Sequence, residues 1–494
     1  MLFASQSIMF LLIFNQFCMI NTFLISSGSE RKKKMADLYT DAVVNFNEKT
    51  GKLRHELHGC NSCPALSSRS LIQFDDEFRK MNFWGTRTHD WALWNSGQRM
   101  VDTHFIFPLM HLDPADPKNY YFKATDDIIK LAHGCNMRVF YRMGTSIEHS
   151  AAGSTSPEGH YNTHMPEDTE KYAEVLAAII RHYTKGWADG FEYEDMKYWE
   201  IWNEPDLGGQ MWCGDYDQFA KFFAIVCKRL KTEFPELKIG GPALTWMNFD
   251  LCEKILDECK KVDVVPDFIS WHRYTSDVQL MLNQPKEFRK FLDDRGFTKT
   301  ELCMNEWHYI VSWDGVQSSA SYDMRIRAMS GPCGMFGIDS ACFNLAVLSG
   351  WQDGPLDSAY YYGAALDGTW GFRDEFRREH ANSYSMKMFG RLLDEADEKV
   401  KADVCQSGFT RTVYVLAAMA KNGKDGKMLV TDYRGASETL EIEVEGMENA
   451  KDVSAILLDK EHNLIPVPVI WKENRLTLLK NYNGSAAFYI TFKN

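Results

Sequence analysis

The sequence lacks the marks of several large classes of protein. It has no excess of positive charge, since 68 acidic residues outnumber 55 Lys and Arg and give a net charge of −13 over 494 residues. Because nucleic acids are bound by basic surfaces, this balance argues against such a partner. No G-x-G-x-x-G follows the first predicted strand, and no H-x-H or H-E-x-x-H spacing supports a metal hydrolase. The sequence therefore predicts neither a cofactor nor a metal.

A disulfide framework is also missing, although there are 12 cysteines. Most stand in apolar runs, as Cys227, Cys303 and Cys342 do, which is typical of small buried hydrophobic residues. This usage favours a reducing compartment. Cys60 and Cys63 form a single C-x-x-C. A structural zinc site would need a second ligand pair, and none is well placed.

The N-terminus has an apolar stretch without the usual flanks of a signal peptide. No Lys or Arg precedes residues 7–25, and no clear A-x-A-like site follows them. The basic run 31–34 comes afterwards and is followed by Met35. Two hypotheses remain. Either residues 1–34 are an upstream extension of a cytoplasmic protein that starts at Met35, or residues 7–25 are an atypical signal or anchor of an exported or membrane-anchored one.

What is present is an alternation of short apolar runs and amphipathic stretches from residue 83 to about 347. Apolar residues recur at three and four positions in 170–183 and 216–230, which indicates helices. Eight strands alternating with helices predict a TIM (β/α)8 barrel, and a doubly wound open sheet is the main structural rival. The predicted strands are 82–90, 104–113, 138–149, 197–206, 238–244, 267–274, 301–309 and 339–347.

The pattern changes after about residue 400. Short strands separated by Gly, Asn, Asp and Lys turns, without helices between them, predict an antiparallel β-sandwich. Residues 42–57 have the pattern of two strands around a turn, which can add to that sandwich. The predicted organisation is an extension, signal or anchor at 1–34, N-terminal strands at 35–75, a barrel at 76–395 and a sandwich domain at 396–494.

Polar residues end the predicted strands, and the carboxyl ends of the strands carry the active site of a TIM barrel. In "YWEIWNEPDLG" a buried strand runs into Asn203 and Glu204, and Pro205 ends it. In "ELCMNEWHY" Glu306 has the equivalent place on the seventh strand. Other polar residues at strand ends, each of which alone is more often structural, are Arg87, His89, Asp90, Glu148, His149, His272 and Tyr274.

Glutamates on the fourth and seventh strands can face each other across the barrel mouth, as glycoside hydrolysis requires. One carboxylic acid protonates the leaving oxygen while the other carboxylate attacks the sugar or activates water. The ionised partner raises the pKa of the acid.

"YWEIWNEPDLGGQMWCG", the following "FAKFFAIVCKRLKTEFPELKIGGPAL" and "DFISWHRY" resemble clan A of the glycoside hydrolases. Asn-Glu-Pro is shared by several families of the clan, whereas "RTHD" and "KIGGPA" are most similar to family 39, the β-xylosidase and α-L-iduronidase group. The resemblance runs from about residue 80 to about 350 and implies retaining hydrolysis. The sandwich also fits that family's architecture.

The resemblance also implies roles for single residues. Glu204 matches the family's acid/base and Glu306 its nucleophile, while Asn203 matches the residue that holds the sugar's 2-hydroxyl. Two departures are expected near the substrate: Asp206 stands where the family often has Asn, and "MNEWHY" is an unusual setting for the nucleophile. Further expected substrate-binding residues are His89, His272, Tyr274, Trp307 and Trp351, the last being either a sugar platform or a core residue.

The glycone remains open at this stage. A β-xyloside-like plant or host glycan, cut from its end, is one reading, and an arabinoside, galactoside or uronide is another. A uronide would need a basic residue near its carboxylate, for which Arg87, Arg142 and Arg273 are the candidates. A non-catalytic carbohydrate-binding protein is the alternative from a different class. Linkage, exo or endo action and oligomeric state do not follow from the sequence.

Overall fold

The computed structural model describes residues 39–62, 64, 75–89, 99–147, 162–316, 320–363, 370–373, 378–406, 408–480 and 483–494. The segment 1–34 lies outside these ranges, as do the predicted polar residues Asp90, Glu148 and His149 and the second cysteine of the C-x-x-C pair, Cys63. Within the described ranges, no helix combines the length and the apolar character needed to cross a membrane.

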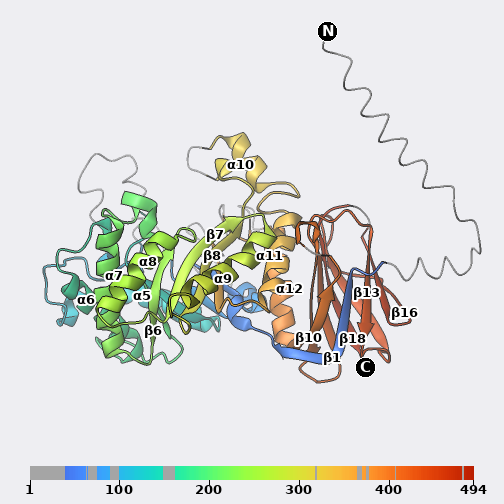
Figure 1. Ribbon diagram of the computed structural model, residues 1–494, viewed down its shortest axis with the longest axis horizontal. Coiled ribbons are helices and arrows are strands. Elements are labelled where there is room, and N and C mark those ends of the chain that lie inside the picture. Colours follow the sequence, from blue (N-terminus) through green and yellow to red (C-terminus); the bar gives the residue numbers. More distant parts are fainter. Residues whose placement is uncertain are drawn as a thin grey trace, which may run out of the picture.

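Eight parallel strands close into a barrel, as predicted, with helices around it (Figure 1). The first strand pairs with both the second and the last, which closes the ring. The barrel strands are β2 (Gly59–Asn61), β3 (Gly85–Arg87), β4 (Arg138–Met143), β5 (Tyr198–Ile201), β6 (Lys238–Leu244), β7 (Phe268–Thr275), β8 (Glu301–Tyr309) and β9 (Ser358–Tyr361).

Most helices form the outer layer of the barrel, whereas α10 (Tyr322–Met329) projects away from it and buries none of its residues (Figure 1). Helix α7 begins at a capping box, in which the Asp215 side chain accepts from the Gln218 backbone N–H and the Gln218 side chain accepts from that of Asp215. The helices are α3 (Asp75–Met81), α4 (Thr103–Ile106), α5 (Lys123–Gly134), α6 (Thr169–Thr184), α7 (Tyr216–Glu233), α8 (Phe249–Lys261), α9 (Val278–Asp293), α10 (Tyr322–Met329), α11 (Ile338–Trp351) and α12 (Ala381–Glu395). Short 3-10 turns are η1 (His55–Leu57), η2 (Pro117–Asn119), η5 (Pro205–Gln210), η6 (Trp313–Gly315) and η7 (Gly408–Thr410).

Two of the eight predicted strands are wrong. Residues 104–113 contain α4 and turns, and Pro108, which cannot donate a hydrogen bond to a strand ladder, stands in the middle of the run. Residues 339–347 lie in α11, which is buried on almost every side and therefore shows no helical period. The true first and last strands were missed, because β2 and β9 have only three and four residues.

The second unit is a ten-stranded sheet that curls into the predicted sandwich. All its pairings are antiparallel except that of β1 with β13. Residues 42–52 form the single strand β1, not two, and lie between β10 and β13. The strands are β1 (Ala42–Lys52), β10 (Ala396–Val404), β11 (Val413–Ala420), β12 (Gly426–Asp432), β13 (Thr439–Glu445), β14 (Asp452–Leu458), β15 (Asn463–Val467), β16 (Ile470–Lys472), β17 (Arg475–Leu479) and β18 (Ala486–Lys493).

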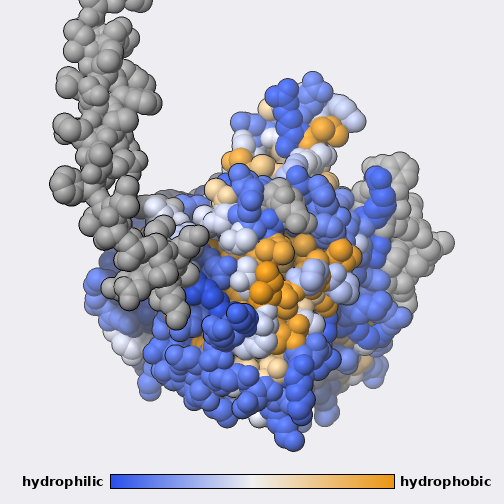
Figure 2. Space-filling model, turned by 90° about the vertical axis from the view of Figure 1, so that its right-hand side faces the viewer, coloured by the Kyte–Doolittle hydropathy of each residue, from blue (hydrophilic) through white to orange (hydrophobic). Residues whose placement is uncertain are grey.

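The sheet has two apolar faces. Residues such as Val430, Ile442 and Phe488 fill the interior of the sandwich. On the other face, Leu416 and Leu429 join the core of the barrel, where α11 and α12 contact the sheet. Figure 2 shows that apolar side chains also gather on the end of the molecule formed by the sandwich. The exposed large apolar residues of β15 to β17 are Ile465, Ile470 and Leu479.

Candidate active site

The turn after β5 brings Glu204 to the mouth of the barrel. Trp202 (φ 74°) and Glu204 (φ 46°) both have left-handed backbones, which non-glycine residues rarely adopt. The turn is held because the Trp202 indole N–H donates to the Met211 carbonyl at 2.8 Å and the Glu204 amide donates to that of Ala243 at 2.9 Å. Strained backbone of this kind clusters at functional sites, where surrounding contacts hold it in place.

Glu306 lies almost fully buried near the end of β8 and accepts hydrogen bonds from β3, from the residues just after β3, and from β7. Arg87 Nη1 of β3 lies 2.8 Å from one carboxylate oxygen, and His89 Nε2 lies 2.8 Å from the same atom. The Tyr274 hydroxyl of β7 donates to the other oxygen at 2.7 Å. These contacts fix the orientation of the carboxylate and hold its charge.

His272 joins the two glutamates. Its Nδ1 lies 2.8 Å from a carboxylate oxygen of Glu204 and 3.3 Å from one of Glu306. Nδ1 donates to the carboxylates when it carries the proton, and it accepts from Glu204 when that carboxyl group is protonated. The two glutamates from β5 and β8 therefore do face each other, with an imidazole bridging them.

A deeper polar layer supports the pair. Arg87 donates to Glu200 Oε2 at 2.7 Å and to Asn203 Oδ1 at 2.7 Å. Glu200 also accepts from Ser270 Oγ at 2.6 Å and from Asn305 Nδ2 at 2.5 Å. Glu200 was not predicted as a site residue. The sequence does mark it, because a carboxylate in the middle of the buried strand "YWEIW" needs polar partners.

The surroundings of Glu306 hold its pKa far below the usual value. Burial alone raises this pKa, but the charges of His272, His89 and Arg87 and the His89 hydrogen bond lower it by more. Glu306 is therefore ionised at neutral pH. Burial raises the pKa of Tyr274 well above its usual value, so its hydroxyl remains a donor.

Glu204, His272 and Glu306 are also the one group in the described ranges whose ligand atoms are close enough to hold a metal ion, within 4.8 Å of one another. Their hydrogen bonds already account for this spacing. A metal bound to Nδ1 of His272 would take the place of its hydrogen bond with Glu204. These three side chains therefore fit a pair of hydrogen-bonded carboxyl groups better than a metal site.

Three aromatic rings surround Tyr274, the residue that donates to Glu306. The rings of Trp313, Tyr362 and Trp370 have centroids 5.2, 5.8 and 5.5 Å from that of Tyr274. Trp313 is 47% exposed, so it can meet a ligand. None of these three was predicted, because they come from loops after β8 and β9, where no periodicity marks them.

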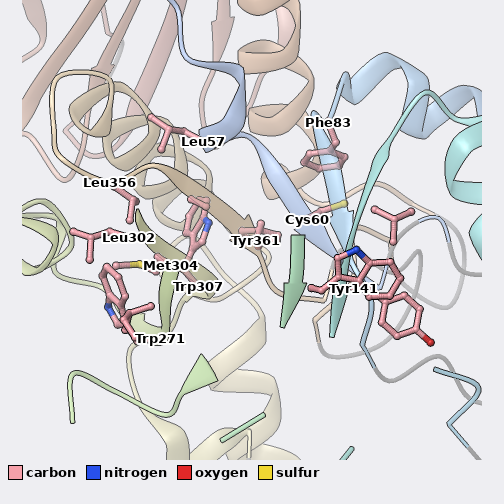
Figure 3. Packing of buried hydrophobic residues seen from close by; sticks show 14 of the residues in the cluster. Leu57, Cys60, Phe83, Tyr141, Trp271, Leu302, Met304, Trp307, Leu356 and Tyr361 are labelled. Atoms are coloured by element: carbon pink, nitrogen blue, oxygen red, sulfur yellow. The ribbon is translucent and has the colours of Figure 1, made fainter. Parts of the chain in front are cut away.

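Two predicted substrate-binding residues do not lie in this cluster. Trp307 is buried, and its ring packs on Tyr361 at a centroid distance of 5.0 Å (Figure 3). The centroid of the Trp351 ring lies 5.2 Å from that of Trp307. Strand alternation explains this, since Glu306 turns into the barrel and its neighbour turns out. Trp351 is also a core residue, and its indole N–H donates to the Met281 carbonyl at 3.0 Å.

Asp206 does not face the site either. Its carboxylate accepts from the Thr245 amide at 2.9 Å and from Asn248 Nδ2 at 3.1 Å. The residue therefore ties the turn after β5 to the loop after β6, and its difference from the family's Asn has a structural role. The predicted residues that the structure does bring together are Asn203, Glu204, Glu306, His89, His272 and Tyr274.

This arrangement defines a class of protein. A closed parallel barrel whose fourth and seventh strands end in paired glutamates, with a sandwich domain attached, is the architecture of the clan A glycoside hydrolases. The family follows from comparison, because residues 42–287 match the family described as Glycosyl hydrolases family 39. The family predicted from the sequence is therefore confirmed, and the chain is a relative of the family 39 glycosyl hydrolases. Glu306 lies beyond the matched range.

Individual relatives agree with this family. A β-xylosidase of Geobacillus stearothermophilus is 27% identical over 174 residues, which are 35% of this chain and 34% of that protein. The match thus spans about a third of that relative's length. A glucosidase from Croceicoccus marinus has a similar structure, with a TM-score of 0.71, 22% identity and coverage of 93% of this chain and 100% of that one.

A further solved structure carries the family's name. A family 39 β-xylosidase from Caulobacter crescentus has a TM-score of 0.61 and 14% identity, covering 92% of this chain and 99% of that one. At these identities the two solved structures show the fold, so the barrel and sandwich predicted from the sequence are confirmed.

Proposed function

We propose that the protein is a retaining O-glycosyl hydrolase that removes a neutral sugar, a β-xyloside or a close relative, from the end of a plant or host glycan. One observation carries this proposal: carboxylate oxygens of Glu204 and Glu306 lie within 4.8 Å of each other. Retaining enzymes keep their carboxyl groups about 5–5.5 Å apart, whereas inverting enzymes need about 6.5–9.5 Å to admit a water.

The chemistry divides between the two glutamates. Glu306, ionised because of its positive neighbours, attacks the anomeric carbon, and the bond from that carbon to the leaving oxygen breaks. Glu204 gives its proton to that oxygen. Glu204 then takes a proton from water, the water oxygen attacks the anomeric carbon, and Glu306 is released as a carboxylate. The Asn203 Oδ1 faces Arg87, so its amide NH₂ is the group that would meet a sugar hydroxyl.

A neutral sugar is favoured because the three arginine candidates are not available to a sugar carboxylate. Arg87 is fully buried and already binds Glu200, Glu306 and Asn203. Arg142 pairs with Asp102 at 2.8 Å and donates to Ser146 Oγ in the loop that follows β4. Arg273 lies between His272 and Tyr274, so strand alternation turns it away from the glutamate pair. The xyloside reading therefore fits better than the uronide reading.

The experiment that tests this function separates the two glutamates. Glu306→Ala should abolish turnover of every aryl glycoside, because no covalent intermediate can form. Azide should then restore activity from the vacated face and give a glycosyl azide of inverted configuration. Glu306→Gln, which keeps the volume and part of the hydrogen bonding, covers the case in which the alanine variant does not fold.

Glu204→Ala should behave differently. Substrates with poor leaving groups should slow by about 10²–10⁴-fold, while dinitrophenyl glycosides keep their first step. Azide should speed the second step and give a product of retained configuration, which NMR of the anomeric proton distinguishes. Glu443→Ala, an exposed glutamate of β13, is the matched control. Unimpaired glutamate variants, or a wild type that binds sugar without turnover, would support a carbohydrate-binding protein instead.

A further inference from the structure

Glu200 is a fully buried carboxylate that has no part in the mechanism above. It lies within β5, three residues before Asn203. A carboxylate is costly to bury unless hydrogen-bond donors surround it. The donors to Glu200 come from three other barrel strands, β3, β7 and β8, and are Arg87, Ser270 and Asn305. Each of these side chains connects Glu200 to one of the two glutamates of the site.

Arg87 connects Glu200 to Glu306. Its Nε donates to Glu200 Oε2 at 2.7 Å, and its Nη2 lies 2.6 Å from the same oxygen. Because a guanidinium is a rigid planar fork, two contacts along one edge fix its plane. Nη1 then donates to Glu306 Oε1 at 2.8 Å, and Nη2 donates to Asn203 Oδ1 at 2.7 Å. Glu200 therefore fixes the direction from which Arg87 binds Glu306.

The Ser270 hydroxyl connects Glu200 to the turn that carries Glu204. It donates to Glu200 Oε1 at 2.6 Å and accepts from the Ala243 amide at 2.8 Å. The Ala243 carbonyl accepts from the Glu204 amide at 2.9 Å. Both Ala243 (φ 59°) and Glu204 (φ 46°) have left-handed backbones, which persist only where surrounding contacts hold them. The Ser270 hydroxyl is therefore one of the contacts that hold this turn in place.

Asn305 connects Glu200 to the part of β8 that carries Glu306. The pairing of β7 with β8 shifts by one residue between Met304 and Glu306, which makes Asn305 the extra residue of a bulge. Bulges next to active sites change the direction of side chains. Asn305 Nδ2 donates to Glu200 Oε1 at 2.5 Å, while the next residue, Glu306, binds Arg87. Two consecutive residues of β8 thus both have partners in the barrel interior, and Glu200 is the partner of the first.

We propose that Glu200 is a positioning residue that sets the orientation of both glutamates of the proposed reaction, Glu204 and Glu306. It acts on Glu306 through the guanidinium and the amide described above, and on Glu204 through the Ser270 hydroxyl. The inference rests on the proposed function, because the orientation matters for the rate only if these two glutamates react. A residue that only stabilises the fold would leave the rates of the folded protein unchanged.

One substrate reports on the two glutamates separately. In 2,4-dinitrophenyl β-xyloside the leaving group needs no proton, so kcat/KM reports the attack by Glu306. The kcat reports hydrolysis of the covalent intermediate, the step in which Glu204 takes a proton from water. A substitution that disturbs only Glu204 therefore lowers kcat and KM together and leaves kcat/KM unchanged.

Glu200→Gln keeps the volume of the side chain and removes its charge. We expect it to lower both kcat and kcat/KM about 10²-fold, because a misplacement of about 1 Å at the reacting groups costs that much. Ser270→Ala removes the connection to Glu204 alone and should lower kcat about tenfold at unchanged kcat/KM. The matched control is Asp432→Asn, which removes the charge of an equally buried carboxylate, paired with Lys480 in the sandwich domain. It should leave both quantities of the folded protein unchanged.

Three results would overturn the proposal: rates of Glu200→Gln equal to those of wild type, losses as large in Asp432→Asn, or a fall of kcat/KM in Ser270→Ala that matches the fall of kcat. Ser270→Ala also covers the case in which Glu200→Gln does not fold. It leaves both charges of the Arg87–Glu200 pair in place, and its separate effect on kcat is expected only from the connection through Ala243.

A crystal structure of Glu200→Gln separates this proposal from the proposed function. We expect Arg87 Nη1 and Glu306 Oε1 to be more than about 3.5 Å apart, beyond hydrogen-bonding distance, while the barrel strands stay in place. Wild-type turnover together with an unmoved Arg87 and unchanged rates would keep the function and remove the role of Glu200. A displaced Arg87 in a protein whose wild type turns over no glycoside would remove the function and keep Glu200 as the residue that orients the carboxyl group of Glu306.

Discussion

At the scale of single residues, the positive groups around Glu306 suit it to the proposed role of nucleophile. Arg87 and His89 both lie 2.8 Å from one of its oxygens, and His272 lies 3.3 Å from the other. Together they hold its pKa low in spite of its burial. Ionised Glu306 therefore stabilises the fold above its unfolded pKa of about 4.3, and this contribution is lost as the pH falls through the lower folded pKa.

The low pKa of Glu306 gives a prediction for pH dependence. His89→Gln removes a positive charge and weakens a hydrogen bond, both of which favour the ionised carboxylate, so it raises the pKa of Glu306. The acid limb of kcat/KM, which reports the free enzyme, should move to higher pH by about one unit. His462→Gln, in the sandwich domain and paired with Asp459, is the matched control. An unchanged or lowered acid limb would mean that His89 does not act through Glu306.

Single residues were predictable where chemistry and position agreed. Glu204, Glu306, His272 and Tyr274 end strands, and polar groups at strand ends of a barrel point to one mouth. Trp307 was predicted to bind substrate but lies outside the cluster. It directly follows the inward-facing Glu306, so strand alternation turns its ring away from the barrel interior and into the surrounding core. Trp313 and Tyr362 were missed because loop residues carry no period, and their position depends on how the loops after β8 and β9 fold back.

At the scale of elements, the alternation of strands and helices predicted the barrel but not its closing strands. The prediction added a strand at 104–113, before β4, and missed β2. Because these two errors cancel in the strand count, β5 and β8 were still correctly predicted as the fourth and seventh strands of the barrel. Helix α11 was taken for a strand because packing between the barrel and the sheet makes it apolar all round. A periodicity argument cannot separate a buried helix from a buried strand.

The junction of β4 and β5 gives a prediction at this scale. Gly144→Ala places a methyl group 3.0 Å from Trp202 at a φ of +105°, so it should lower the free energy of unfolding by about 1–3 kcal/mol and also lower kcat/KM. The control is Gly134→Ala at the end of α5, where an added Cβ meets nothing within 4 Å. Urea unfolding and turnover of an aryl glycoside measure the two effects. Equal effects of the two substitutions would show that Trp202 does not depend on the glycine.

At the scale of the whole molecule, the sandwich contacts the barrel through polar side chains that lie away from the glutamate pair. Asp339 of α11 accepts from Arg434 Nε at 2.8 Å and from Ser485 Oγ at 2.6 Å, both from the sheet domain. Arg434 also donates to the Tyr309 hydroxyl, at the end of the strand that carries Glu306. Among the contacts of the two glutamates described above, none comes from the sheet domain.

The barrel and sheet should therefore be linked in stability but not in chemistry. Asp339→Asn weakens the contact with Arg434 and should lower the free energy of unfolding by about 1–3 kcal/mol, because Asp339 is buried. The kcat/KM of the folded protein should change less than about twofold, since no sheet residue contacts the glutamate pair among the described residues. Asp452→Asn, which breaks an exposed pair with Lys493 on the sheet, should leave both quantities unchanged. A tenfold loss of kcat/KM in Asp339→Asn at unchanged stability would contradict this, because the sheet would then act on the site through Tyr309 and β8.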